Sequence, residues 1–294
     1  MGRIVMPTTD LGFEKILAST DHKNITRGFI ADFFGLSVNV DDIHIVNPYS
    51  IQPADGPDGQ RKLTETFRDI TVEIADADLC LEMQVVREAN FVKRALYYMD
   101  DLYTSRYKAG RGKGRQRRRP DGLDRYAILR PVWSMNVLAQ PGLDCEHPFH
   151  MFRLHDVDLN ESLVPELVRL GFFELSKPGA SAKLARWRDF LTSGVAQGGD
   201  PDYLHEAASI IEYVNFSTEE RHMADLHEKF IADRDSGLYW AKQDGIKQGL
   251  EQGLEHTARE LLRRGLSHDD IVAITGLDGA SVDRLAEELG LVDV

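Results

Sequence analysis

The sequence predicts an α/β protein that contains a β-hairpin and ends in a helical C-terminal region. Residues 67–74 and 79–86 alternate apolar and polar side chains with period two, as the strands of a β-hairpin do. Apolar residues between positions 91 and 102 recur instead at helical spacing. Beyond about residue 178, amphipathic helical patterns separated by Pro and Gly dominate the chain.

The predicted hairpin gathers its polar groups on one face. We expect Asp69 to lie opposite Gln84, and Thr71 opposite Glu82 on the neighbouring pair. A shift of one residue would set aliphatic residues against Glu82 and Gln84, so the pattern favours this register. Since diagonal neighbours in a sheet are about 7–8 Å apart, Asp69 and Glu82 are expected to be close enough to share one divalent cation.

Two carboxylates with an amide beside them suit a hard cation. Mg²⁺ prefers oxygen ligands in octahedral geometry and usually keeps several waters. Bound beside a phosphate, such an ion activates water and offsets charge on the phosphoryl oxygens. The spacing alone leaves a second interpretation open, in which Asp69, Glu82 and Gln84 only line the solvated face of an antiparallel sheet.

Asp69, followed by Glu82-Met83-Gln84, resembles the D…ExQ form of the PD-(D/E)XK nuclease motif. This form is found in the recombination-promoting nucleases, also called PD-(D/E)XK nuclease family transposases. The likeness continues in order along nearly the whole chain, at residues 10–15, 47–48, 62, 91–98, 102–103, 126–132, 173–177, 187–191 and 245–249. It implies a restriction-endonuclease-like fold, in which a mixed sheet is flanked by helices. It also implies a Mg²⁺- or Mn²⁺-dependent endonuclease that hydrolyses DNA phosphodiester bonds and promotes recombination or transposition.

The resemblance gives roles to four residues. Asp69 and Glu82 would hold the metal, and Gln84 would orient a water or a phosphate oxygen. Gln84 carries no positive charge and cannot donate a proton as an acid, unlike the Lys of the general motif. Arg94 would point toward the active site, where its guanidinium can bind a phosphate through two hydrogen bonds. The alternative for Arg94 is a structural ion pair with a core carboxylate.

Two further acidic residues are candidates for the site. The first helix of this fold often supplies an additional carboxylate, and here Asp10 and Glu14 lie one turn apart on a common helix face. Glu14 stands where the family usually carries Lys. An acidic first turn that is favoured by the helix dipole explains the same pattern without a catalytic role.

The net charge of −13 argues against a nucleic-acid partner, but the distribution of charge does not. Residues 108–119 contain seven basic side chains and no acidic ones. Because long-range repulsion is screened beyond about 8 Å, a dense basic loop can still bind phosphates. The DNA-contacting candidates are Lys108, Arg111, Lys113, Arg115, Arg117, Arg118 and Arg119. The alternative is a solvated charged loop.

The composition argues against a disulfide-stabilised, zinc-binding, membrane or exported protein. The two cysteines, Cys80 and Cys145, form no C-x-x-C pair, and neither a disulfide framework nor a zinc site is expected. His147 and His150 lack further donors and are not expected to bind a metal. No apolar run approaches the roughly 20 residues that cross a bilayer, and the N-terminus lacks an export pattern. We therefore expect a cytoplasmic protein without a membrane partner.

The 294 residues divide into three predicted parts: a nuclease-like core at 1–178, a helical region at 179–244, and a tail at 245–294. The tail opens with Gly245, Gly249 and Gly253, four residues apart, which favour a weakly stable helix or a linker. A helix-turn-helix outline follows from Ser267 onward. Its second helix is acidic and would repel phosphate, which favours packing or self-association into a homo-oligomer over DNA binding.

Two rival functions remain compatible with the sequence. One is a DNA-binding or assembly protein that kept the fold but is catalytically weak. The other is a regulator whose tail does the binding. Both carboxylates of the motif, Asp69 and Glu82, are present, and this favours the enzyme.

Overall fold

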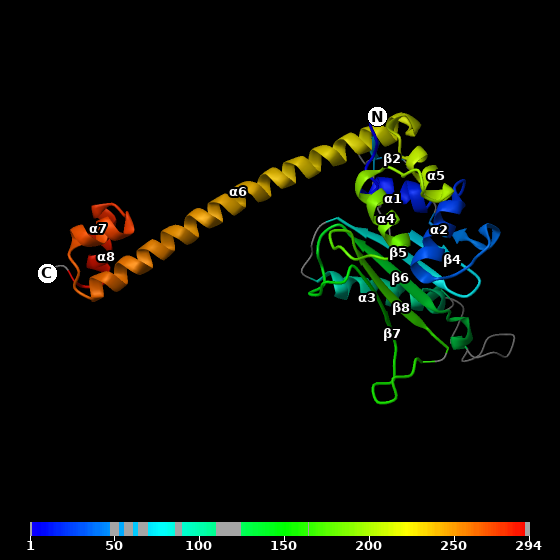
Figure 1. The fold of residues 1–294 in the computed structure, drawn as a ribbon, viewed down its shortest axis with the longest axis horizontal. Helices are drawn as coiled ribbons and strands as arrows, with labels where there is room; N and C mark the ends of the chain where they lie inside the picture. Colours follow the sequence, from blue (N-terminus) through cyan, green and yellow to red (C-terminus); the bar gives the residue numbers. More distant parts are fainter. Residues whose placement is uncertain are drawn as a thin grey trace. The chain divides into compact units, whose positions relative to one another are not determined.

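The structure is a computed structural model that describes residues 2–47, 53–55, 61–63, 70–85, 90–109, 125–163 and 165–291 (Figure 1). The α-helices are α1 (Asp10–Leu17), α2 (Lys23–Phe34), α3 (Phe91–Ala109), α4 (Ala182–Ser193), α5 (Asp202–Ile210), α6 (Thr218–Arg263), α7 (His268–Thr275) and α8 (Gly279–Glu288). The strands are β1 (His44–Ile45), β2 (Pro53–Asp55), β3 (Arg61–Leu63), β4 (Ile70–Glu73), β5 (Asp78–Gln84), β6 (Val132–Leu138), β7 (Phe149–Arg153) and β8 (Val168–Glu174). Short 3-10 helices are η1 (Val40–Asp42), η3 (Arg125–Ile128) and η4 (Tyr213–Asn215).

Contacts between residues divide the chain into two compact units, 1–224 and 225–294. The first unit is built on a six-stranded sheet in the order β1-β4-β5-β6-β8-β7. The three strands β5, β6 and β8 run parallel, with α3 as the crossover between β5 and β6, and the flanking strands are antiparallel. β2 and β3 pair separately. The predicted mixed sheet is confirmed.

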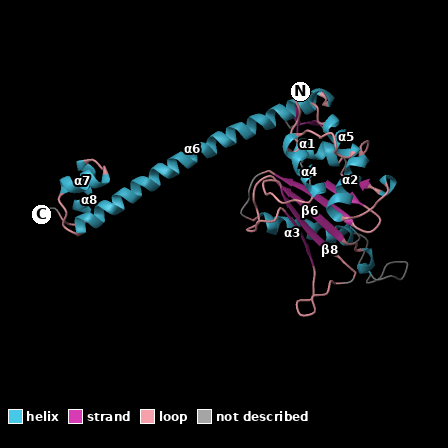
Figure 2. Ribbon diagram, in the orientation of Figure 1, coloured by secondary structure: helices cyan, strands magenta, loops and turns pink. Residues whose placement is uncertain are grey.

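One face of the sheet packs against α1, α2, α4 and α5 (Figure 2). The apolar residues of α2 recur three and four positions apart, and Phe29 and Phe33 therefore share the face that enters the core. Trp187 of α4 is fully buried against both rings. Leu79 and Leu81 of β5 complete this layer from the sheet side.

The other face of the sheet is covered by α3. Phe91, Ala95 and Met99 lie one turn apart along this helix and pack with Leu138 of β6 and Phe172 of β8. The sheet is thus flanked by helices on both faces, as the sequence predicts. β5 lies between the two helical layers, so its alternate side chains enter different surroundings.

The hairpin register differs from the predicted one. Thr71 pairs with Cys80 and not with Glu82, a shift of two residues along β5. A shift of two keeps every side chain on its own face, so the alternation of apolar and polar residues cannot distinguish the two registers. The turn decides between them, because Ile74 N–H donates to the Ala77 carbonyl and Asp78 enters the strand.

The predicted boundaries at residues 178 and 244 remain predictions of sequence organisation. In the structure α4 and α5 contribute Leu184, Trp187 and Leu204 to the same core as the sheet. The start of α6 also belongs to the first unit, since Met223 packs with Leu11 of α1. The first compact unit accordingly extends to residue 224.

In the second unit, α6 is a single helix that continues through the glycine repeat. The sequence left a weakly stable helix or a linker open for this repeat, and the structure has a helix there. Each Gly costs about 1 kcal/mol relative to Ala, but the intervening Leu, Glu, Gln and Lys are strong helix formers. None of the described helices is long and apolar enough to cross a membrane.

The helix-turn-helix outline is confirmed in α7 and α8. The Ser267 hydroxyl caps α7 by accepting from Asp270 N–H, and Gly276 ends it in the left-handed conformation. Asp278 caps α8 in the same way. The last turns of α6 join the pair, and Leu262, Ile271 and Leu285 share a small core of the three helices.

Candidate active site

The polar face of the β4–β5 hairpin is the candidate active site. Successive side chains of β5 alternate between the two faces, so Glu82 and Gln84 point to the α3 side while Leu81 and Met83 enter the apolar core. The Glu82 side chain is 13% exposed, and Gln84 is 9% exposed. A carboxylate and an amide are therefore held on one face with little contact with solvent.

Arg94 in the first turn of α3 lies over this face. Its Nη2 donates to Glu82 Oε1 at 2.7 Å, and the packing of Phe91 and Ala95 fixes the helix that carries it. The sequence left two roles open for Arg94, a phosphate ligand or a partner for a core carboxylate. The structure pairs it with a carboxylate that is itself the candidate metal ligand.

A second ion-pair cluster fixes the other end of α3 on β5. Asp78 is buried and accepts from Arg106 Nε at 2.9 Å, and Arg130 Nε lies 3.5 Å from the same carboxylate. Arg106 also pairs with Glu73 at 2.6 Å. The hydrogen bond that Arg106 donates to Asp78 is the largest cause that raises the pKa of the Arg106 guanidinium, against the lowering effect of burial. With two anchored ends, α3 holds Arg94 in place.

The neighbouring strand β6 adds polar residues that were not predicted from the sequence. Asn136 pairs with Glu82 across the parallel ladder and is buried. Its Nδ2 donates to Ser134 Oγ at 3.0 Å and to the Gly171 carbonyl at 3.1 Å, which fixes the orientation of the amide. The signal was available, because Ser134 and Asn136 are two polar residues at period two within an otherwise apolar strand.

The structure thus brings together three of the four predicted catalytic residues, namely Glu82, Gln84 and Arg94. Asp69, the remaining one, lies outside the described residues. It directly precedes β4, whose residue Thr71 has its backbone N–H bound to Asn47 Oδ1 at 2.7 Å. Asn47 is one of residues 47–48, a stretch that contributes to the resemblance to the family.

Asp10 and Glu14 lie on α1, in the other helical layer. The buried side of α1 contributes Phe13 and Ile16 to the core that Leu81 enters. Glu82 points to the opposite face of β5, so the packing of α1 does not direct these two carboxylates at the Glu82 face. Their catalytic role remains a prediction.

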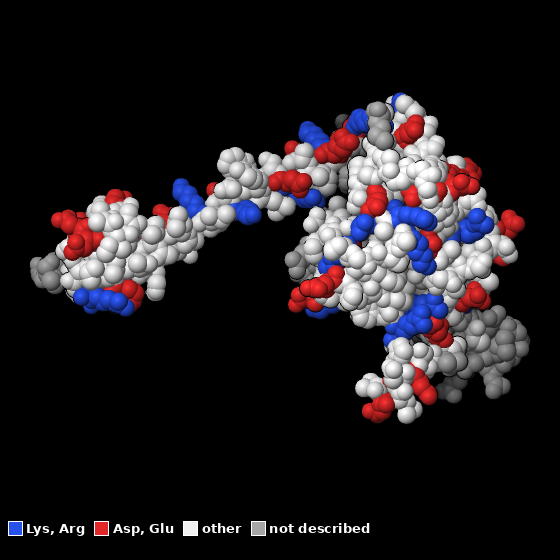
Figure 3. Space-filling model, viewed as in Figure 1, with Lys and Arg blue, Asp and Glu red and all other residues white. Residues whose placement is uncertain are grey.

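Most of the predicted DNA-binding run lies outside the described residues. Lys108, the first member, ends α3 on the surface and forms a 2.6 Å ion pair with Asp101. The hydrogen bond that Lys108 donates to Asp101 is the main cause that raises the pKa of Lys108. Arg111, Lys113, Arg115, Arg117, Arg118 and Arg119 are not described. On the described surface shown in Figure 3, acidic and basic side chains of the first unit are interspersed.

A mixed sheet with helices on both faces, with Glu82 and Gln84 two residues apart on β5, is consistent with a PD-(D/E)XK nuclease fold. The sequence model of the PD-(D/E)XK nuclease family transposases matches residues 7–241 of the chain. The chain therefore belongs to this family. Comparison with curated proteins gave no significant match, and comparison with solved structures gave none either.

Proposed function

We propose that the protein is a metal-dependent DNA endonuclease that hydrolyses phosphodiester bonds. The observation that carries this proposal is the nearly buried Glu82 carboxylate beside Gln84 and in contact with Arg94, in the residue order of the nuclease motif. A hard carboxylate and an amide on one face are the donor types that Mg²⁺ or Mn²⁺ prefers. Promotion of recombination or transposition in the cytoplasm is the cellular role that we propose.

Asp69 and Glu82 would hold the metal. Asp69 stands one residue before β4 in the sequence, and β4 pairs with β5, the strand that carries Glu82. When bound, the ion lowers the pKa of water and offsets charge on the phosphoryl oxygens. Both residues would then act as oxygen ligands on one face of the sheet.

In this proposal Arg94 binds a phosphate of the DNA and Gln84 orients a water. Arg94 now orients Glu82, and its guanidinium offers further N–H donors that a phosphate of DNA can accept. Gln84 presents both a donor and an acceptor, so its amide can orient a water in line with the phosphate. Neither residue needs to gain or lose a proton in these roles.

The alternative is a catalytically weak DNA-binding or assembly protein on the same fold. Two observations favour it: Gln84 replaces the charged Lys of the general motif, and the Arg94 guanidinium neutralises Glu82 at 2.7 Å. A metal must compete with that ion pair for the carboxylate. Cleavage and DNA binding therefore have to be measured separately.

Conversion of supercoiled plasmid to the open circular form tests the proposal. We expect conversion by the full chain in Mg²⁺ or Mn²⁺ and none when EDTA is present. DNA binding without conversion in either metal would support the alternative. Loss of both binding and conversion would contradict the assignment of DNA as the substrate.

The basic run supplies a quantitative prediction about DNA binding. Replacement of Arg115, Arg117, Arg118 and Arg119 by Ala should weaken binding to all DNA sequences alike, because phosphate contacts carry no base information. If all four contact duplex phosphates, the slope of log affinity against log salt should fall by about 3.6, at 0.9 per contact. Filter binding or fluorescence anisotropy at several salt concentrations measures this slope.

A control variant with the same change in charge separates local contact from net charge. It carries Ala at four basic positions on α2 and α4: Lys23, Arg27, Lys183 and Arg186. We expect the control to keep the wild-type slope. An equal loss of slope in both variants, or no loss in either, would show that the basic run is a solvated loop that does not contact DNA phosphates.

We further propose that the tail serves self-association into a homo-oligomer. Trp240, Ile246 and Leu250 are exposed on α6, and a long helix with exposed apolar groups gains stability from a partner. Truncation before Gly245 should lower the particle mass in light scattering and leave metal-dependent cleavage intact at high protein concentration. Unchanged mass with loss of preference among DNA sequences would instead assign DNA recognition to the tail.

Ile246→Gln combined with Leu250→Gln tests the same contact without removing α7 and α8. These two positions lie one turn apart on α6 and outside the small core of the tail. The double variant should show the lower mass of the truncated protein. A wild-type mass would show that the association, if present, uses another surface.

A further inference from the structure

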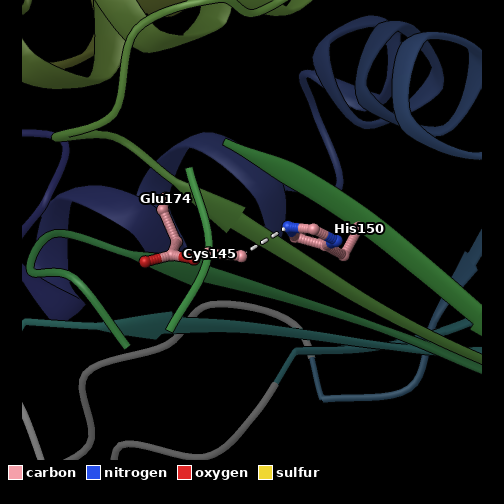
Figure 4. Close-up of side chains that lie close together, drawn as sticks. All are labelled: Cys145, His150 and Glu174. Carbon is pink, nitrogen blue, oxygen red and sulfur yellow. Dashed lines mark hydrogen bonds between the residues drawn. The ribbon is translucent and has the colours of Figure 1, made fainter. Parts of the chain in front are cut away.

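Three potential metal ligands meet at the end of the sheet outside the candidate active site. Cys145 lies in the loop after β6, His150 is on β7, and Glu174 ends β8 (Figure 4). One ligand atom of each residue lies within 4.8 Å of the other two. No further donors for His147 and His150 were expected from the sequence, but the fold brings Cys145 and Glu174 close to His150.

The spacing of these atoms suits a tetrahedral ion after a small adjustment. Cys145 Sγ and His150 Nε2 are 3.0 Å apart and hydrogen-bonded. In a zinc site with a Zn–S bond of about 2.3 Å and a Zn–N bond of about 2.0–2.1 Å, the same two atoms would be about 3.6 Å apart. The His147 carbonyl oxygen lies 3.1 Å from Nε2 and 3.8 Å from Sγ. An outward movement of roughly half an ångström would thus admit the ion, with water or this carbonyl as the fourth donor.

Hydrogen bonds from the protein hold both carboxylate oxygens of Glu174 in place. Its side chain is fully buried, and Oε2 accepts from Gly142 N–H at 2.8 Å while Oε1 accepts from Lys177 Nζ at 2.7 Å. Lys177 Nζ also lies 3.7 Å from Cys145 Sγ and donates to the Leu143 carbonyl. A single ammonium therefore occupies the space between the carboxylate and the thiol.

We propose that Cys145, His150 and Glu174 form a Zn²⁺ site. Thiolate and imidazole are softer ligands than carboxylate and select Zn²⁺ over Mg²⁺. The thiol of Cys145 releases its proton to solvent on binding, and His150 binds through Nε2 as neutral imidazole. Zn²⁺ takes over the role of Lys177 as the positive partner of Glu174, and the ammonium moves off Oε1.

The zinc site lies on the same face of the sheet as Glu82, but two strands away from it. Glu174 pairs with Leu138, which pairs with Gln84, so two strand spacings of about 4.8 Å separate Glu174 from Gln84. The ligands come from a loop, the edge strand β7 and the end of β8. The bound ion therefore fixes the edge of the sheet and acts as a structural metal.

Absorption spectroscopy with Co²⁺ tests this proposal on the full chain. We expect a near-ultraviolet thiolate-to-cobalt charge-transfer band that Zn²⁺ abolishes and that excess Mg²⁺ leaves unchanged. Cys145→Ser should remove the band, and His150→Ala should weaken Co²⁺ affinity by more than about 100-fold, since even residues that only orient ligands change affinity 10–100-fold.

Matched controls use the other cysteine and an exposed histidine. Cys80→Ser and His155→Ala should keep the band and the affinity of the wild-type protein. Absence of the band in the wild type, its persistence in Cys145→Ser, or its displacement by Mg²⁺ would overturn the zinc site. Zn²⁺ should also raise the melting temperature of the wild type but not of Cys145→Ser, and equal shifts would contradict the proposal.

Lys177→Gln tests the proposal through an expected gain in Zn²⁺ affinity, where the other variants are expected to lose affinity. It removes the positive charge and keeps a donor for Glu174, so Zn²⁺ should bind about tenfold more tightly or better. Unchanged or weaker affinity would show that Glu174 is not a ligand. A damaged fold cannot produce tighter binding, which keeps this result independent of stability.

Discussion

Glu82→Gln should reduce metal-dependent nicking of plasmid DNA by more than about 10³-fold, because a metal ligand supports several kcal/mol of transition-state stabilisation and each 1.36 kcal/mol is tenfold in rate. The substitution keeps the shape of the side chain and an acceptor for Arg94 Nη2. The fold should therefore survive. Single-turnover nicking at saturating Mn²⁺ measures the chemical step without product release.

Glu73→Gln is the matched control for this variant. Glu73 ends β4, the strand that pairs with β5, and makes an ion pair with Arg106 at 2.6 Å. Glu73→Gln changes the charge of the hairpin by the same amount as Glu82→Gln. We expect a wild-type nicking rate for the control, and nicking by Glu82→Gln at that same rate would remove Glu82 from the active site.

Trp187→Ala should lower the free energy of unfolding by about 3–5 kcal/mol, the usual cost of deleting a fully buried aromatic side chain. Trp187 stacks on Tyr203 at 5.8 Å and meets the Phe29 ring edge-on at 5.2 Å. Its Nε1 also donates to Asp32 Oδ2 at 2.9 Å. The urea midpoint should fall by at least about 1 M, given slopes of about 1–3 kcal/mol per molar urea.

Trp133 fluorescence reports this transition, since Trp133 lies on β6 within the same unit and remains in the variant. Tyr97→Ala is the control, because Tyr97 is 66% exposed on α3. Exposed positions usually change stability by no more than about 0.5 kcal/mol. Equal midpoints for Trp187→Ala and the wild type would contradict the packing of α4 on the sheet.

Hydrophobic periodicity was sufficient to predict the hairpin, its apolar face and the helices of the tail. It could not determine the pairing of Thr71, since registers two residues apart bury the same side chains. The turn at residues 74–77 and the ion pairs of Asp78 determine that register. Both depend on individual residues and leave no periodic signal in the sequence.

The candidate site was predictable in part. Glu82, Gln84 and Arg94 were identified through the ordered motifs of the family, and their proximity depends on how α3 crosses back over β5. Asn136 was missed because a polar residue in an apolar strand shows its importance only when the neighbouring strand is known. The order of apolar and polar residues within one strand does not show which residue of the neighbouring strand lies beside it.

The cluster of Cys145, His150 and Glu174 carried still less signal in the sequence. Its members come from a loop and two strands, and only the antiparallel pairing of β7 with β8 brings them together. The spacing rules for zinc motifs describe ligands that are close in sequence. A site assembled across strands falls outside those rules.

We propose that the polar face of the hairpin holds the metal that supports DNA cleavage, with Asp69 as the partner of Glu82. Plasmid nicking by Asp69→Ala in Mg²⁺ or Mn²⁺, measured beside the wild type at equal fractions of bound DNA, is the decisive measurement. We expect nicking by the wild-type protein and none above the EDTA background by Asp69→Ala. Equal nicking by the two proteins would contradict it.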